Sequence, residues 1–242
     1  MTQTTVPIEE IVNIFYARKY AYDILRRFFI EEPSREYLKP FVQKNMIDLF
    51  PYKENSEEIQ AGIRDIKAYL STHDVINIER HYQELHWDFT RMFIGPFEVS
   101  TPPWESSYVS RNGLLFQETT MNVRKIYEKY GINVKDFNIE PDDHIGFELD
   151  FIYHMNELCF KAADPTQEWG LPELQQLLKE QKSFIESHLL LFVPEFSKRV
   201  INEANTEFFS GLAKILHQFL LIDSEVLKDL LDIDIVLEEV TL

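Results

Sequence analysis

Apolar residues recur at three- and four-residue steps along most of the chain, the spacing that is typical of amphipathic helices. The clearest run covers residues 7–30, where Pro7 stands at a first-turn position and Pro33 ends the run. No stretch alternates apolar and polar residues for long enough to demand a sheet. The pattern therefore predicts an all-α protein of about nine to ten helices.

Ser34 and Ser56 are expected to cap two of these helices at their N-termini. The predicted helices are 7–30, 34–49, 56–71, 75–93, 104–130, 141–163, 172–190, 194–221 (with a candidate break near Asn205) and 224–232. The polar stretch 132–140 is either a connector within one domain or a hinge between an N-terminal lobe, 1–131, and a C-terminal lobe, 141–242. A hinge of this kind would permit domain-swapped dimers beside the monomer.

Charge and composition narrow the range of partners. The 242 residues carry 24 Lys and Arg against 41 Asp and Glu, a formal charge of −17. This balance disfavours nucleic acid and suits a cationic partner, such as an arginine-bearing peptide, although it also serves solubility. Cys159 is the single cysteine, and no run approaches the roughly 20 apolar residues of a membrane span. We expect a cytoplasmic protein without stable membrane insertion.

Common catalytic motifs are absent from the sequence. It contains no Glu-x-x-His pair, no His-Glu-x-x-His, no Gly-x-Ser-x-Gly and no phosphate-binding loop. The pairs His144/Glu148 and Asp150/His154 are each four residues apart, which suits metal ligands or, more simply, polar pairs on a helix surface. We therefore predict no enzyme and no cofactor, with a metal-dependent helical-bundle enzyme as an alternative.

The most informative loop is 95–103, which carries three prolines in eight residues and cannot form a regular helix. A loop stiffened by proline loses little entropy when it orders, so it can present aromatic side chains in fixed positions. Phe97, Trp104 and Tyr108 are of the types that anchor peptide partners. The alternative is that they cover a small satellite core beneath the loop.

These residues carry a resemblance to a known family. Phe93-Ile94-Gly95-Pro96 followed by Pro102-Pro103-Trp104-Glu105-Ser106-Ser107-Tyr108 resembles the signature of the TorD/DmsD/NarJ-type redox enzyme maturation chaperones. Glu140-Pro141-Asp142-Asp143-His144 is similar to the Glu-Pro-x-Asp-His segment of that family, and residues 188–209 match its C-terminal helices more weakly. The resemblance implies an all-helical chaperone that binds the twin-arginine signal peptide, or the immature form, of a molybdenum or tungsten oxidoreductase. Such chaperones assist cofactor insertion and delay export.

The resemblance also implies a peptide-binding site. The candidate residues are Phe93, Phe97, Trp104, Glu105, Tyr108, Pro141, Asp142, Asp143 and His144. Two guanidinium groups followed by an apolar stretch require carboxylates and an aromatic groove, and this set offers both. We expect Asp142 and Asp143 just inside a helix start and His144 as a brace rather than a donor. A NarJ-like assembly factor, which serves a non-exported client without a functional twin-arginine signal, is the alternative.

Overall fold

The computed structural model of the chain describes residues 5–95, 99–110, 115–116, 118–134 and 140–236. Within these ranges the fold is all-α apart from one small sheet, which confirms the predicted fold class. The α-helices are α1 (Ile8–Ile30), α2 (Arg35–Gln43), α3 (Glu57–Thr72), α4 (Glu79–Phe89), α5 (Ser106–Val109), α6 (Glu118–Lys129), α7 (Ile145–Ala163), α8 (Leu171–Phe184), α9 (Leu190–Glu203) and α10 (Glu207–Asp232). Two 3₁₀ turns, η1 (Met46–Leu49) and η2 (Lys53–Asn55), and two π-helical turns, η3 (Thr90–Ile94) and η4 (Ile185–Leu189), complete the helical part.

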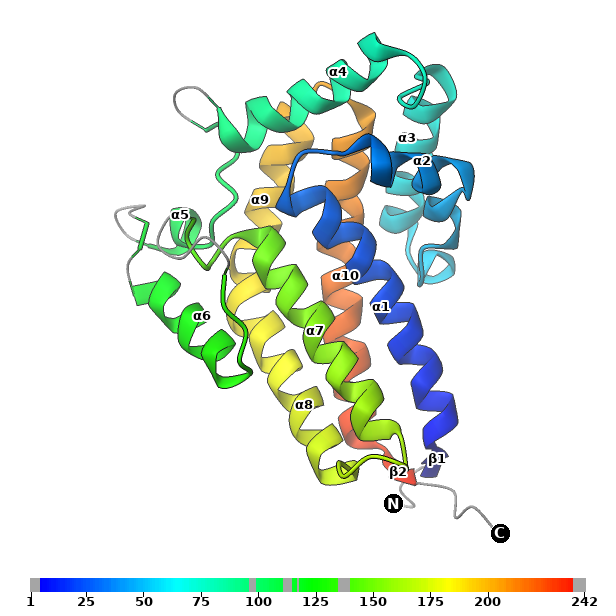
Figure 1. Cartoon of the computed structure of the whole chain (residues 1–242), viewed down its shortest axis with the longest axis vertical. Coiled ribbons are helices and arrows are strands. Elements are labelled where there is room, and N and C mark those ends of the chain that lie inside the picture. Colours follow the sequence, from blue (N-terminus) through cyan, green and yellow to red (C-terminus); the bar gives the residue numbers. More distant parts are fainter. Residues whose placement is uncertain (1–4, 96–98, 111–114, 117, 135–139, 237–242) are drawn as a thin grey trace.

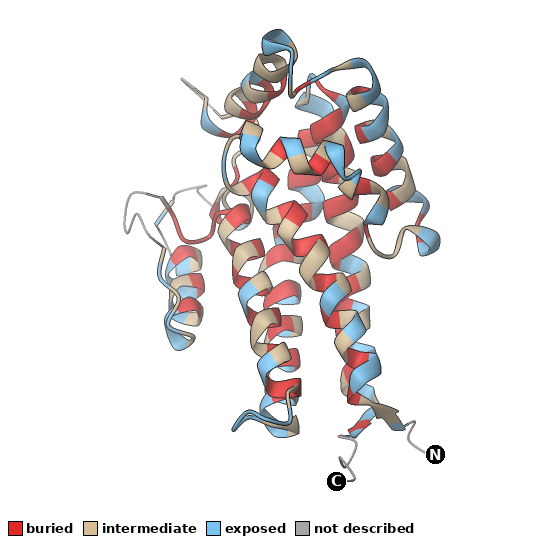
Figure 2. Cartoon of the chain, turned by 45° about the vertical axis from the view of Figure 1, so that its right-hand side comes forward, coloured by how far each residue is buried: buried red, intermediate tan, exposed pale blue. Residues whose placement is uncertain are grey.

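The long helices run side by side along the long axis of the molecule (Figure 1). Helix α1 packs against α7, and α10 packs against α3, α8 and α9. Helix α4 crosses the end of the bundle that lies away from the termini. Buried residues recur along each of the long helices (Figure 2), and the buried hydrophobic residues form one cluster. The described residues therefore build a single helical domain.

The short sheet joins the two ends of the chain. Strands β1 (Thr5–Pro7) and β2 (Asp234–Val236) pair in parallel, with Val6 opposite Ile235. Three-residue strands are too short to show period-two alternation, so the sequence pattern did not indicate them. Among the helices that the structure describes, none combines the length and the apolar character that a membrane span needs.

The two predicted serine caps are present at the N-termini of α2 and α3. The Ser34 side chain accepts a hydrogen bond from the Tyr37 backbone N–H, and the Ser56 side chain accepts one from Ile59, as predicted. Helix α1 begins directly after Pro7. The break expected near Asn205 is confirmed, since α9 ends at Glu203 and α10 begins at Glu207.

Several predicted helix boundaries are wrong. The helix from 34 ends at Gln43, and the helix expected from 75 begins at Glu79. The gap expected between the predicted helices 172–190 and 194–221 is absent, because one run from α8 through η4 to α9 passes Pro194. Proline costs least here, because the π turn just before it already interrupts the regular hydrogen-bond ladder. No new helix begins at 224, because α10 continues unbroken to Asp232.

The predicted helix 104–130 is also wrong. Trp104 forms an isolated antiparallel bridge with His144, and α5 covers only four residues before α6 begins at Glu118. This pairing joins residues far apart in sequence, so helical periodicity carries no signal for it. Phe97 and residues 135–139 of the predicted hinge lie outside the described residues, and the division into two lobes stays a prediction.

Candidate functional site

A short backbone pairing brings the two sequence motifs together. The Glu105 N–H donates to the Asp143 carbonyl oxygen at 2.9 Å, and the Ile145 N–H donates to the Pro103 carbonyl oxygen at 2.7 Å. These bonds flank the bridge between Trp104 and His144. The proline-rich loop is thereby fixed against the N-terminus of α7.

The side chains of Asp142 and Asp143 stabilise this junction through hydrogen bonds to neighbouring segments. The Asp143 carboxylate accepts hydrogen bonds from the Ser106 backbone N–H at 2.7 Å and from the Thr120 hydroxyl at 2.8 Å. The Asp142 carboxylate accepts from Arg124 at 2.6 Å and 3.0 Å. Both aspartates are buried and precede α7, so the expectation that they lie inside the helix is wrong.

His144 caps helix α7. Its Nδ1 accepts a hydrogen bond from the Gly146 backbone N–H at 3.0 Å, so the ring proton lies on Nε2. Burial lowers the pKa of His144 to about 3, and the imidazole is neutral at physiological pH. Gly146 allows the close approach of α1, because a Cβ there would lie 2.4 Å from the Ile30 Cα. His144 therefore braces the start of α7, in the role that its chemistry favours.

A buried group of carboxyls lies beside the junction. The Glu105 carboxylate, which is buried, contacts His188 Nδ1 at 2.9 Å on the π turn η4. Glu148 is fully buried, and no N–H or hydroxyl of the described residues donates to either of its oxygens. Burial and the charges of Glu105 and Asp143 raise the pKa of Glu148 well above its usual value. Glu148 therefore holds its proton to a higher pH than an exposed carboxyl does.

The burial of Glu148 was missed by the sequence reasoning, which placed it on a helix surface. Its neighbours Ile145, Leu149 and Ile152 mark the buried face of α7 and could have indicated it. In the second pair, Asp150 and His154 contact each other at 3.3 Å on the partly exposed side. No group of three or more His, Cys, Asp or Glu within the described ranges is placed to hold a metal ion.

A cleft of about 960 Å³ opens in front of the Trp104–His144 bridge. We call it the Trp104 cleft. Its apolar lining includes Ile30, Phe93, Ile94, Pro103, Trp104 and Phe147, and its charged lining includes Arg26, Arg27, Glu31, Glu32, Glu140 and Asp150. It therefore lies between the end of α1, the turn η3, the proline-rich loop and the start of α7.

The cleft has an acidic rim that the sequence reasoning did not assign to the site. Glu140 accepts a hydrogen bond from the Trp104 indole N–H at 2.6 Å, and burial raises the pKa of this carboxyl. Glu32 accepts from the Thr90 hydroxyl at 3.0 Å, and Glu31 is exposed. The two arginines are already paired, Arg26 with Asp23 and Asp150, and Arg27 with Asp23. Neither arginine therefore pairs with Glu31, Glu32 or Glu140, and Glu32 lies 3.9 Å from His86 Nε2.

The predicted site residues within the described ranges fall into three sets. Phe93, Trp104 and His144 line the Trp104 cleft, although Phe93 and His144 are themselves buried. Behind the cleft lie the buried residues Glu105, Pro141, Asp142 and Asp143. Tyr108 faces α9 instead, with its ring 5.7 Å from that of Phe192 and its hydroxyl donating to the Pro102 carbonyl oxygen.

Comparison with known proteins identifies the family. The model of the nitrate reductase delta subunit family matches residues 53–198, more than half of the chain. The chain belongs to this family. Both motifs and every predicted site residue lie within the matched range.

Curated relatives agree with this assignment. The chain is 29% identical over 205 residues to the chaperone protein TorD of Aliivibrio salmonicida, covering 84% of this chain and 91% of the relative. It is 26% identical over 228 residues to TorD of Aliivibrio fischeri (94% and 99% covered), and 28% identical over 221 residues to TorD of Vibrio vulnificus (91% and 99%). The resemblance to TorD/DmsD/NarJ-type chaperones is confirmed. These relatives are named as chaperones, which supports the prediction that the chain is not an enzyme.

Proposed function

We propose that this chain acts in the cytoplasm as a chaperone that binds the twin-arginine leader of an immature molybdenum oxidoreductase in the Trp104 cleft. Binding would keep the client from export until its cofactor has been inserted. The observation that carries the proposal is the cleft itself, where an aromatic wall meets an acidic rim at the junction of two motifs of a chaperone family.

The chemistry of the cleft suits both parts of such a leader. The carboxylates of Glu31, Glu32 and Glu140 offer charge-assisted hydrogen bonds to guanidinium groups. The apolar stretch that follows the arginines would contact Ile94, which is exposed, and Trp104. Because Glu140 also holds the Trp104 indole, an arginine bound there would be positioned against the aromatic wall.

Under this proposal Asp142, Asp143 and Glu105 act through the shape of the cleft rather than by contact with the peptide. Their carboxylates are engaged by Arg124, by Ser106 and Thr120, and by His188, respectively. Replacement of Asp143 would free the Ser106 backbone N–H and loosen the loop that carries Trp104. Its effect on binding would therefore be indirect.

A NarJ-like assembly factor for a non-exported client is the second candidate function. The match to the nitrate reductase delta subunit family favours it. Such a factor would grip the N-terminus of its client mainly through the apolar wall of the cleft. The two functions differ in their dependence on the two arginines.

Calorimetric titration with the leader peptide of the oxidoreductase encoded nearest to this chain tests the proposal. We expect micromolar or tighter binding, about −8 kcal/mol, and a loss of roughly tenfold in Glu140→Gln and in Trp104→Ala. Glu195→Gln, on the exposed surface of α9, is the matched control and should bind as wild type. Unchanged binding of a peptide with both arginines replaced by glutamine would favour the NarJ-like function, and an absence of binding would contradict both.

A further inference from the structure

A second hollow, of about 630 Å³, lies between the end of α3, helix α4 and the turn that joins α9 to α10. We call it the Trp87 pocket. Its lining includes the aromatic rings of Tyr69, His73 and Trp87, the carboxylates of Glu84, Asp88 and Glu207, and the arginines Arg80 and Arg91. It shares no lining residue with the Trp104 cleft, so neither the two motifs nor the proposed function accounts for it.

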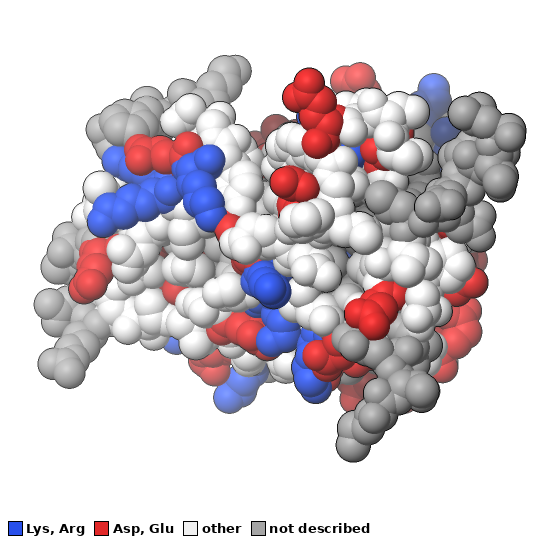
Figure 3. All heavy atoms as spheres, turned by 90° about the horizontal axis from the view of Figure 1, so that it is seen from below, with Lys and Arg blue, Asp and Glu red and all other residues white. Residues whose placement is uncertain are grey.

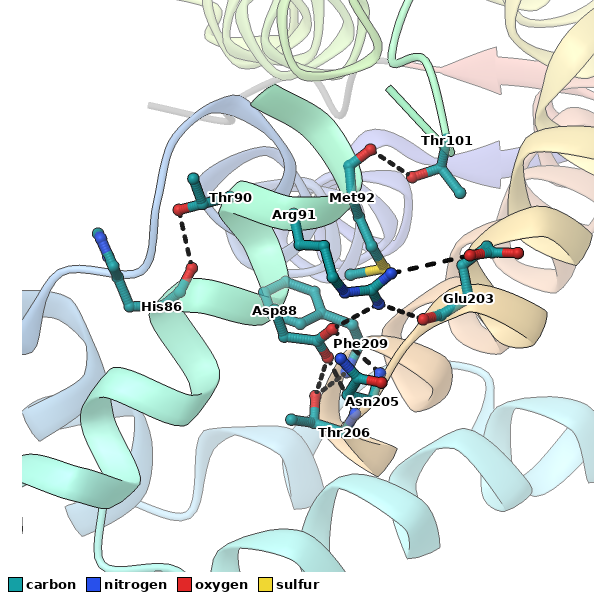
Figure 4. A network of polar contacts seen from close by, with 10 residues as sticks. All are labelled: His86, Asp88, Thr90, Arg91, Met92, Thr101, Glu203, Asn205, Thr206 and Phe209. Atoms are coloured by element: carbon teal, nitrogen blue, oxygen red, sulfur yellow. Dashed lines mark hydrogen bonds and ion pairs between the residues drawn. The ribbon is translucent and has the colours of Figure 1, made fainter. Parts of the chain in front are cut away.

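One wall of the pocket is fixed by Asp88. Its carboxylate accepts hydrogen bonds from the backbone N–H groups of Asn205 (3.0 Å) and Thr206 (2.9 Å) and from the Thr206 hydroxyl (2.8 Å) (Figure 4). Arg91 contacts Asp88 at 3.1 Å and also donates to the Glu203 carbonyl oxygen at the end of α9. Asp88 and Arg91 therefore hold α4 against the α9–α10 turn and are committed to that task.

The other polar groups of the pocket are not committed in this way. Within the described ranges no basic side chain forms an ion pair with Glu207, and Glu84 is held by Arg80, whose side chain is 84% exposed. Such surface pairs contribute little and are easily exchanged for another cation. His73 lies 3.8 Å from Glu84 and stacks on the Tyr69 ring at 4.2 Å.

Two further groups indicate a ligand. The Trp87 side chain is 61% exposed, which is unusual for a large aromatic residue that contributes nothing to the core. The buried Tyr69 hydroxyl has no hydrogen-bond partner among the described residues. Burial, followed by the charges of Glu84, Asp88 and Glu207, raises the pKa of Tyr69, so these three carboxylates lie near its ring.

We propose that the Trp87 pocket binds an arginine side chain on the client protein, outside the leader that enters the Trp104 cleft. The choice of the client as the partner rests on the proposed function. A planar guanidinium would stack on the exposed indole face while donating to the carboxylates of Glu84 and Glu207. Three carboxylates against two arginines, Arg80 and Arg91, line the pocket, which disfavours an anion, and an apolar side chain would give Glu207 no ion-pair partner. Two separate contacts with one client would strengthen binding through effective concentration.

The three tryptophans of the chain make the test direct, because Trp87 lies in this pocket, Trp104 lies in the cleft and Trp169 lines neither. The indole N–H signals, assigned with single Trp→Phe variants, are followed by nuclear magnetic resonance while the tripeptide acetyl-Gly-Arg-Gly-amide is added. The peptide with citrulline in place of arginine is the neutral control. We expect a saturable shift of the Trp87 signal with the arginine peptide and none with the citrulline peptide. The double variant Glu84→Gln/Glu207→Gln should bind the arginine peptide at least about fivefold more weakly than wild type.

The outcomes separate this proposal from the proposed function. A silent Trp87 signal overturns the second site, whether or not Trp104 responds to the peptide. An equal response of Trp87 to the citrulline peptide overturns guanidinium recognition, as does undiminished binding in the double variant. A Trp87 response beside a failed leader titration at the Trp104 cleft keeps this site and contradicts the proposed function alone.

Discussion

The buried carboxyl of Glu148 makes the stability of the folded chain depend on pH. Its pKa is raised above the ordinary value of 4.5 by burial and by Glu105 and Asp143, so between the unfolded and the folded pKa the folded chain holds a proton that the unfolded chain releases. The unfolded chain therefore binds fewer protons, and the contribution of Glu148 to stability falls as pH rises above about 4.5. The loss is about 1.4 kcal/mol per pH unit until the folded pKa is reached.

Glu148→Gln removes this proton exchange and keeps the shape of the side chain. We expect the variant to be about 1–3 kcal/mol more stable than wild type at pH 7.5, with the difference shrinking towards pH 4.5. Urea unfolding at several pH values measures this. Glu195→Gln, which removes an exposed carboxyl, should show no comparable trend. A Glu148→Gln variant less stable than wild type at pH 7.5 would contradict the raised pKa of Glu148.

Sequence reasoning found the members of the candidate site better than it found their tasks. It selected Phe93, Trp104 and His144, which line the cleft. It also selected Asp142 and Asp143 as arginine acceptors, although both accept from this chain's own donors. Residue type and spacing do not reveal which carboxylates face inward, because that depends on distant segments.

Helices α3 and α10 cross in close contact at two glycines, Gly62 and Gly211. A Cβ at Gly62 would lie 2.5 Å from the Gly211 carbonyl oxygen, and a Cβ at Gly211 would lie 2.5 Å from the Gly62 carbonyl oxygen. Backbone atoms cannot give way here, so the two helices would have to separate. The two glycines therefore set the distance between α3 and α10.

Gly62→Ala tests this crossing. Alanine favours an isolated helix over glycine by about 1 kcal/mol, yet overpacking typically costs about 1–3 kcal/mol, and we expect net destabilisation. Chemical denaturation followed by circular dichroism measures the change. Gly170→Ala is the control, because its Cβ would meet nothing nearer than 3.8 Å. A Gly62→Ala variant more stable than wild type would contradict the close packing of these helices.

The helices themselves were predictable where burial follows a regular period. The run 7–30 differs from α1 by one residue at its start, and Ser34 and Ser56 cap α2 and α3 as predicted. The errors fall where distant parts of the chain decide the backbone. At Trp104 a bridge to His144 replaces the expected helix, and α10 runs past position 224 because its apolar face continues in register with the core.

The two halves of the chain interleave in the folded molecule. Helix α1 packs on α7, α3 packs on α10, and β1 pairs with β2, so each contact joins the first half to the second. The Phe29 ring contacts Phe196 at 5.8 Å, and Phe28 contacts Phe208 at 5.0 Å. A lobe made of residues 1–131 would lose these partners if it stood alone.

Acidic and basic side chains both reach the surface at the β1–β2 end of the bundle, as the face seen in Figure 3 shows. The formal charge of −17 gives the protein as a whole no attraction for an anionic partner. Long-range attraction to a basic leader, in contrast, would speed its encounter with the chaperone at low salt.

Interleaved halves predict cooperative unfolding, even with a polar connector at 132–140. Two variants, one keeping only Trp87 and the other only Trp169, place a fluorescence probe in each half of the sequence, with the remaining tryptophans changed to Phe. Because the α1–α7 and α3–α10 interfaces must break together, we expect each variant's fluorescence midpoint in urea to coincide with its own midpoint by circular dichroism. An earlier transition at one probe would instead show that a lobe unfolds independently. That result would mean that two chains can exchange lobes at a small cost in free energy. Coincident midpoints would mean that a domain-swapped dimer forms only through nearly complete unfolding.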